Sequence, residues 1–189
     1  MIRCRRPRKP KVFDRLVGRP GRAWLRANPG SDDLPDFWKL VRPNLARGFE
    51  YRCAYTAMLC LDGTVDHFVS VKANRRQAYR WSNYRYAAHW INSSKQNADD
   101  EVLDPFEIGD DWFEVIMPSM QLVVTDAVPA RYKDIAEHTL TRLHLGNDER
   151  VVRQREYWYR EYQAGTPLDR IDQYAPLLAR AIRKALGIP

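Results

Sequence analysis

The chain has 189 residues, of which 44% are hydrophobic and 12% aromatic, and it carries a net charge of +7 at pH 7. This composition favours one packed domain and excludes a disordered chain. There is no apolar run of about eighteen residues, so the sequence predicts no membrane-spanning helix, and the basic first residues lack the apolar stretch of a secretory signal. Three cysteines without a disulfide spacing favour free thiols and a cytoplasmic localisation.

The charge is distributed in blocks along the chain. Residues 1–30 contain ten Arg and Lys residues and one acid, residues 71–95 contain six bases and no acid, and residues 96–130 contain nine acids and no base. A basic block attracts a polyanion through counterion release, without any sequence preference. The pattern therefore favours a nucleic-acid partner, although a solvated basic tail has the same composition.

The first half of the chain predicts a small strand-and-helix centre. Residues 1–36 are rich in Arg, Pro and Gly and have weak periodicity, so they predict a basic N-terminal arm or an extended wrap, and residues 37–50 predict a short helix. Two strands are expected between Tyr51 and Phe68, joined by a hairpin turn at Asp62-Gly63. Residues 70–84 predict a long polar loop, and a helix is expected from Tyr86 to Gln96.

The second half predicts two further strands followed by helices. Residues 111–116 and 121–125 have strand patterns, and Pro129 suits the first turn of a helix. Asp148 can cap a second helix that Gly165 ends, and apolar residues recur at helical spacing from 171 to 186. The expected fold class is α+β: an arm (1–36), a core (37–128) and a C-terminal helical region (129–189) packed on that core.

Residues 53–95 contain the motif that separates this chain from other basic proteins. Cys53-Ala54-Tyr55 precedes Asp66-His67-Phe68, and Asn92 begins an Asn-x-x-Lys sequence that ends at Lys95. Asn83 follows His67 by sixteen residues and precedes Asn92 by nine. This pattern resembles the HNH (ββα-metal) endonuclease family, and in particular a branch often found beside ATPases in phage-defence loci. The resemblance implies a central ββα-metal motif, metal-dependent cleavage of DNA in phage defence or restriction, and a partner ATPase.

The resemblance implies a role for each motif residue. Phosphodiester hydrolysis needs a base for water and a cation for the developing charge. His67 and Asn83 are the predicted catalytic residues, His67 as the base and Asn83 as the residue that holds the loop and orients His67. Asp66 and Asn92 are the predicted metal ligands, because their oxygen donors suit one Mg²⁺ or Mn²⁺ ion.

Basic residues in and before the motif are the predicted contacts to the DNA backbone. Lys95 lies one helical turn beyond Asn92, and several arginines lie in or after the intervening loop. The predicted set is Lys95, Arg75, Arg76, Arg80 and Arg85, together with Arg3, Arg5 and Arg6 of the arm.

One feature departs from the family pattern. Many members of the branch hold the fold with a structural zinc bound by two Cys-x-x-Cys pairs, whereas the matching positions here are Cys53 with Thr56 and Ala88 with Ile91. Three of the four sulfur ligands are missing, so structural zinc is not expected. Ala88 and Ile91 instead predict hydrophobic packing at this place.

Several alternatives stay open at this point. Each motif residue alone has a structural explanation, because a histidine in an apolar stretch is usually structural and an asparagine often belongs to a turn. The chain could be a catalytically silent nucleic-acid-binding subunit of a defence complex, or an RNA-cleaving toxin on the same fold. The acidic residues Asp104, Glu107, Asp110 and Asp111 could bind a cation, although a solvated loop explains them more simply.

Overall fold

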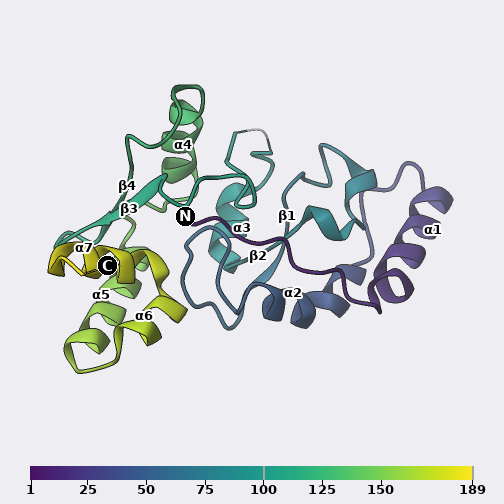
Figure 1. Ribbon diagram of the computed structural model, residues 1–189. Helices are drawn as coiled ribbons and strands as arrows, with labels where there is room; N and C mark the ends of the chain where they lie inside the picture. Colours follow the sequence, from purple (N-terminus) through teal and green to yellow (C-terminus); the bar gives the residue numbers. More distant parts are fainter. Residues whose placement is uncertain (100, 189) are drawn as a thin grey trace.

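The two antiparallel strand pairs and the helices around them form a mixed α+β fold that is mainly helical, as the sequence predicted. A computed structural model describes residues 1–99 and 101–188 (Figure 1). The molecule is elongated, with α1 at one end, α5, α6 and α7 at the other, and β1, β2 and α3 between them. In chain order the elements, with η marking 3-10 or π turns, are η1 (Asp14–Gly18), α1 (Arg19–Ala27), η2 (Phe37–Val41), α2 (Arg42–Gly48), β1 (Thr64–His67), η3 (Arg75–Gln77), η4 (Trp81–Asn83), β2 (Tyr84–Ala87), α3 (His89–Lys95), β3 (Phe113–Ile116), β4 (Gln121–Val124), α4 (Ala130–Arg142), α5 (Glu149–Gln163), α6 (Leu168–Tyr174) and α7 (Pro176–Leu186).

The central strand pair differs from the expected hairpin. β1 pairs antiparallel with β2, which places Asp66 opposite Arg85, whereas residues 51–60 contribute only one isolated bridge. A glycine is needed at position 63 because the Tyr86 ring packs against its backbone, and a Cβ there would lie 2.5 Å from that ring. The prediction of a 51–68 hairpin is therefore wrong, and the first residues of the expected 86–96 helix belong to β2. α3 follows β2 after a single residue.

The N-terminal segment contains regular structure that the sequence analysis did not predict. Phe13 and Val17 are buried one helical turn apart, and Gly21 on α1 lies directly against the ring of Tyr79. These contacts stabilise η1 and α1 through the burial of side chains rather than through helix propensity. The prediction of an arm or extended wrap is therefore wrong for residues 14–27, which are helical.

The C-terminal half follows the predicted pattern closely. β3 and β4 pair antiparallel where two strands were expected, and the Asp148 carboxylate accepts the backbone N–H of Arg150 as the cap of α5. Gly165 ends that helix with a φ of +100°, a conformation that favours glycine. The third predicted helix is divided into α6 and α7, because Pro176 has no backbone N–H to continue α6.

A search of the described residues found no helix both long and apolar enough to cross a membrane.

Candidate functional site

One pocket brings together three residues that the sequence analysis placed in the site. Asp66 and His67 from the end of β1 and Asn92 from α3 all line a pocket of about 540 Å³. Because β1 and β2 are paired and α3 starts directly after β2, the backbone alone brings α3 against the end of β1. The pocket also receives side chains from the loop after β1 and from the end of α3, namely Ser70, Val71, Lys72, Arg75, Gln96 and Asn97.

Asp66 forms the buried wall of this pocket. Its side chain is 2% exposed, its Oδ2 accepts the hydroxyl of Tyr55 at 2.6 Å, and its Oδ1 lies 3.3 Å from Nζ of Lys95. Burial and the neighbouring carboxylate raise the pKa of Tyr55 well above its usual range. The phenol therefore stays protonated and donates a hydrogen bond to Asp66. The carboxylate is therefore fixed in place by two donors.

Lys95 does not lie where the sequence analysis placed it. The side chain is fully buried, and its ammonium group donates to the carbonyl oxygens of His67 at 3.0 Å and Phe68 at 2.8 Å in addition to Asp66. A buried ammonium with three oxygen partners cannot reach a solvent-exposed phosphate. We therefore correct the assignment of Lys95 from a DNA contact to a residue that fastens the end of β1 to α3.

His67 is held so that one ring nitrogen can accept a proton. Nε2 lies 2.9 Å from the carbonyl oxygen of Ala78, which can only accept, so the neutral imidazole carries its proton on Nε2 and leaves Nδ1 as the acceptor. The rings of Trp38 and Tyr84 meet the imidazole edge-on, with centroids 4.7 and 5.2 Å away. Burial lowers the pKa of His67 below its ordinary value of 6.5, although the Ala78 carbonyl acts in the opposite direction. The unprotonated form is thus favoured.

Asn83 closes the loop between β1 and β2. Its amide oxygen accepts the backbone N–H of Val69 at 2.8 Å, and its amide nitrogen donates to the carbonyl oxygens of Val69 at 2.9 Å and Gln77 at 3.3 Å. One buried side chain therefore ties together two points of the loop and the start of β2. Since the same loop contains Ala78, these bonds also help to position the partner of His67.

Arg85 is the second correction among the predicted DNA contacts. Its side chain is 2% exposed and makes two hydrogen bonds to Asp104, at 2.9 and 2.6 Å, while its guanidinium lies 3.8 Å from the centre of the Phe106 ring. A guanidinium that is buried and bound by both carboxylate oxygens has no face left for a phosphate. Arg85 anchors β2 to the segment that follows α3.

The predicted acidic cluster is used in similar contacts. Asp104 binds Arg85, Glu107 pairs with Arg6 at 3.0 Å, and the Asp110 carboxylate accepts the backbone N–H of Arg3. These carboxylates therefore attach the N-terminal segment and β2 to the loop 101–112.

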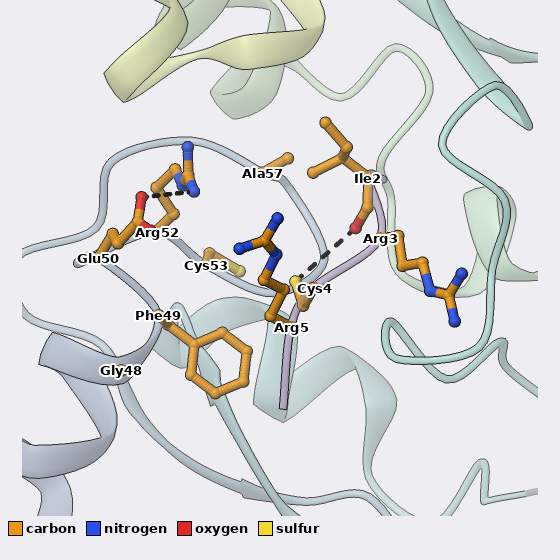
Figure 2. Close-up of a pocket in the computed structure, with 10 residues that line it drawn as sticks. All are labelled: Ile2, Arg3, Cys4, Arg5, Gly48, Phe49, Glu50, Arg52, Cys53 and Ala57. Carbon is orange, nitrogen blue, oxygen red and sulfur yellow. Dashed lines mark hydrogen bonds and ion pairs between the residues drawn. The ribbon is translucent and has the colours of Figure 1, made fainter. Parts of the chain in front are cut away.

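The first arginines of the chain lie away from the pocket of His67. Arg3 and Arg5 line a different pocket, together with Cys53 and Arg52, as Figure 2 shows. Arg6 is partly taken by its pair with Glu107. Arg76 and Arg80 are exposed as well, but they line a groove that shares Lys72 and Arg75 with the pocket of His67. The structure thus separates two groups that the sequence analysis had combined as DNA contacts.

Some residues of the pocket were missed in the sequence. Asp32 lies at its rim, and Asp99 binds both the backbone N–H and the hydroxyl of Ser70, which lies in the wall. Asp32 precedes Asp66 by thirty-four residues and lies outside the motif, so no spacing could identify it. Trp38 gave no signal either, because one aromatic residue in an apolar stretch predicts only core packing.

The four positions at which many members of the branch carry zinc ligands are occupied here by packed side chains. The Sγ of Cys53 accepts the backbone N–H of Ala88 at 3.4 Å, and the side chains of Thr56 and Ile91 are buried. Cys53 and Ala88 therefore touch in space, at two of the positions where the family resemblance would place zinc ligands. Among the described residues, no group of three or more His, Cys, Asp and Glu side chains could hold a metal ion.

Comparison of the chain with family models, with curated proteins and with solved structures gave no match.

The oxygen donors of the pocket are of the kind that a hard divalent cation prefers. Two of them are the Asp66 carboxylate and the amide oxygen of Asn92, the predicted ligands, and the adjacent Lys95 ammonium reduces the negative charge that a cation would meet. Each carboxylate oxygen of Asp66 has one described polar partner and can accept a second. This donor set fits one Mg²⁺ or Mn²⁺ ion completed by water and substrate oxygens, and it does not fit a closed metal site built from protein ligands alone.

Proposed function

We propose that the protein is a metal-dependent endonuclease of the HNH type, which hydrolyses phosphodiester bonds of DNA. The observation that carries the proposal is the convergence of Asp66, His67 and Asn92 on one pocket at the junction of β1, β2 and α3. An antiparallel strand pair followed by a helix is the arrangement that the resemblance implies. The contact between Cys53 and Ala88 also supports the proposal, because the resemblance places both residues at zinc-ligand positions, which must lie close together in space.

The roles of the residues follow from their contacts. Nδ1 of His67 accepts a proton from the attacking water, because Nε2 is committed to the Ala78 carbonyl. Asn83 keeps that carbonyl in place by holding the loop at Gln77, next to Ala78. Asp66 and Asn92 would hold the divalent ion, with Asp66 fixed by Tyr55 and Lys95. When bound, the ion supplies charge stabilisation for the phosphate and the leaving oxygen.

A plasmid-nicking assay tests the proposal. Supercoiled plasmid, single-stranded DNA and tRNA are incubated with the protein in Mg²⁺, Mn²⁺ or EDTA, using wild type, His67→Ala and Asn92→Ala. His89→Ala is the matched control, because His89 is an exposed histidine on the same helix as Asn92. We expect metal-dependent plasmid cleavage that falls by at least about 100-fold in His67→Ala and is unchanged in His89→Ala. Equal cleavage by wild type and His67→Ala would remove His67 as the base, and cleavage of tRNA alone would identify an RNA-cleaving enzyme.

A second function is favoured by one observation. The ammonium of Lys95 already lies 3.3 Å from Asp66, and an ammonium so placed can satisfy the carboxylate without a metal ion. This contact supports a silent subunit that binds DNA and does not cut it. The same assay separates the two, because the silent subunit would retard DNA in a gel but leave the plasmid supercoiled in both metals. The setting that the resemblance implies, phage defence beside a partner ATPase, stays a prediction.

A further inference from the structure

A row of arginines lies on α1, an element that the family motif does not include. Arg19, Arg22 and Arg26 follow one another at spacings of three and four residues, which places them on one face of the helix, and all three are exposed. In the part of the chain that the structure describes, none of them forms an ion pair with an acid. Their charge is therefore available to an external partner.

α1 and the loop after β1 form the two walls of a basic groove. The groove has a volume of about 900 Å³, with Arg22 and Arg26 on the α1 wall and Lys72, Arg76 and Arg80 on the loop wall. None of the residues given for its lining is acidic. Positive side chains on both walls of one concave surface attract a polyanion more strongly than the same charges spread over a convex surface.

The groove is built into the fold and does not depend on mobile side chains alone. A Cβ on Gly21 would lie 2.1 Å from Cγ of Tyr79, so the helix backbone packs directly on the ring of Tyr79, which is buried and does not itself line the groove. The guanidinium of Arg75 donates to the carbonyl oxygens of Asn28 at 2.9 Å and Ser31 at 2.6 Å, just after the end of α1. Arg75 is therefore a positioning residue that holds the C-terminal end of α1 against the loop.

The groove leads to the pocket of His67. Lys72 and Arg75 line both the groove and that pocket, so the two surfaces are continuous. From Arg19 to Arg26 the helix extends about 10 Å along its axis, which equals the axial rise of about three phosphates in one strand of duplex DNA. A strand that follows the helix face can therefore bring the next phosphates to His67.

We propose that this groove, formed by α1 and residues 72–80, binds the sugar-phosphate backbone of double-stranded DNA next to the bond that is cut. The proposal rests on the proposed nuclease function for its orientation towards His67, but the binding itself can be measured without cleavage. Duplex DNA is favoured over a single strand because the residues given for the groove lining include no aromatic side chain. Proteins that bind single strands usually provide aromatic rings on which the unpaired bases stack.

Binding of a fluorescein-labelled 20-base-pair duplex, measured by fluorescence anisotropy in EDTA over a range of salt concentrations, tests the groove. The variant is Arg22→Gln/Arg26→Gln/Arg76→Gln, which removes three exposed charges from the two walls. The control is Arg131→Gln/Arg153→Gln/Arg160→Gln, which removes the same charge from exposed positions on α4 and α5, two helices that lie away from α1 (Figure 1). Circular dichroism and thermal unfolding of both variants show that the fold is kept.

We expect the slope of log Kd against log salt concentration to fall by about 3 in the groove variant, because each lost phosphate contact contributes about 0.9. Between about 50 and 200 mM salt, wild type would then lose roughly 40-fold more affinity than the groove variant, while the control keeps most of the wild-type slope. Equal slopes of log Kd against log salt concentration in the groove variant and the control variant would show that the groove does not bind DNA. Tighter binding of the matching single strand, lost in the groove variant, overturns the choice of duplex DNA. A wild type that binds through the groove but cuts no DNA keeps the groove and overturns the proposed nuclease.

Discussion

The β1–β2 and β3–β4 pairs are both antiparallel and four residues long in each strand, but they bury different kinds of side chain. The first pair buries Asp66 and Arg85, which form ion pairs with Lys95 and Asp104 respectively. The second pair buries apolar side chains, namely Phe113, Val115 and Leu122. Its one charged residue, Glu114, is partly exposed and pairs with an exposed lysine, Lys184.

This difference shows that the chain can build a strand pair without buried charges. A buried ion pair adds little net stability over apolar residues of the same volume, because both ions lose their hydration. The charges inside the first pair therefore point to a requirement other than stability. In our proposal that requirement is the fixed position of Asp66 and of the end of β1 at the pocket.

The largest effect is expected from removing the buried partner of Asp66. Lys95→Met keeps most of the side-chain volume but leaves a buried carboxylate with only the Tyr55 hydroxyl, which should lower the free energy of unfolding by about 3–5 kcal/mol. The matched change in the second pair, Lys184→Met, removes the exposed partner of Glu114 and should cost about 0–1 kcal/mol. Urea denaturation followed by tryptophan fluorescence measures both. Similar losses in the two variants would mean that the strand pairs do not differ in the way described.

Lys95 also shows where sequence reasoning stops. The sequence reveals a basic residue one turn after Asn92, but it does not reveal whether the side chain points outward to a phosphate or inward to carbonyl oxygens. Arg85 was misplaced for the same reason, since its partner Asp104 lies nineteen residues further on. Burial of a charge depends on tertiary contacts that no local pattern contains.

Local features, in contrast, were predicted well. The Asp148 cap, the Gly165 helix end and the strands around Pro118 each depend on a few neighbouring residues. The partner of β1 was missed because strand pairing over twenty residues is not local, and Asp62-Gly63 has the composition of a hairpin turn. Asp66, His67 and Asn92, which the motif spacing singled out, line one pocket because β1, β2 and α3 meet there.

A smaller effect is expected at the loop that Asn83 closes. Asn83→Ala leaves the backbone groups of Val69 without their side-chain partner and should cost about 1–3 kcal/mol of stability. The corresponding change in the turn of the second strand pair is Ser119→Ala, which removes an exposed bond to the carbonyl of Ile116 at 3.3 Å and a long one from the backbone N–H of Gln121 at 3.5 Å, and it should cost less than about 0.5 kcal/mol.

Asn83→Ala should also release Ala78 and so lower DNA cleavage more than its loss of stability explains, when both are measured well below the unfolding temperature. If stability falls while cleavage per folded molecule stays at the wild-type level, Asn83 is a structural residue only.

The smallest effect concerns pH and again separates the two strand pairs, because only the first contains a histidine. Burial lowers the pKa of His67, so the folded protein resists protonation between that lowered pKa and the ordinary value of 6.5, whereas the unfolded chain takes up the proton. The free energy of unfolding should therefore decrease as the pH falls below 6.5. The decrease should be smaller in His67→Gln, in which the other three histidines are unchanged.

For cleavage, the same lowered pKa keeps Nδ1 available as a base, so the acid limb of kcat/KM should have its midpoint below pH 6.5. A midpoint above 6.5, together with identical pH dependence of unfolding in wild type and His67→Gln, would show that the pocket does not desolvate the imidazole and that another group sets the acid limb.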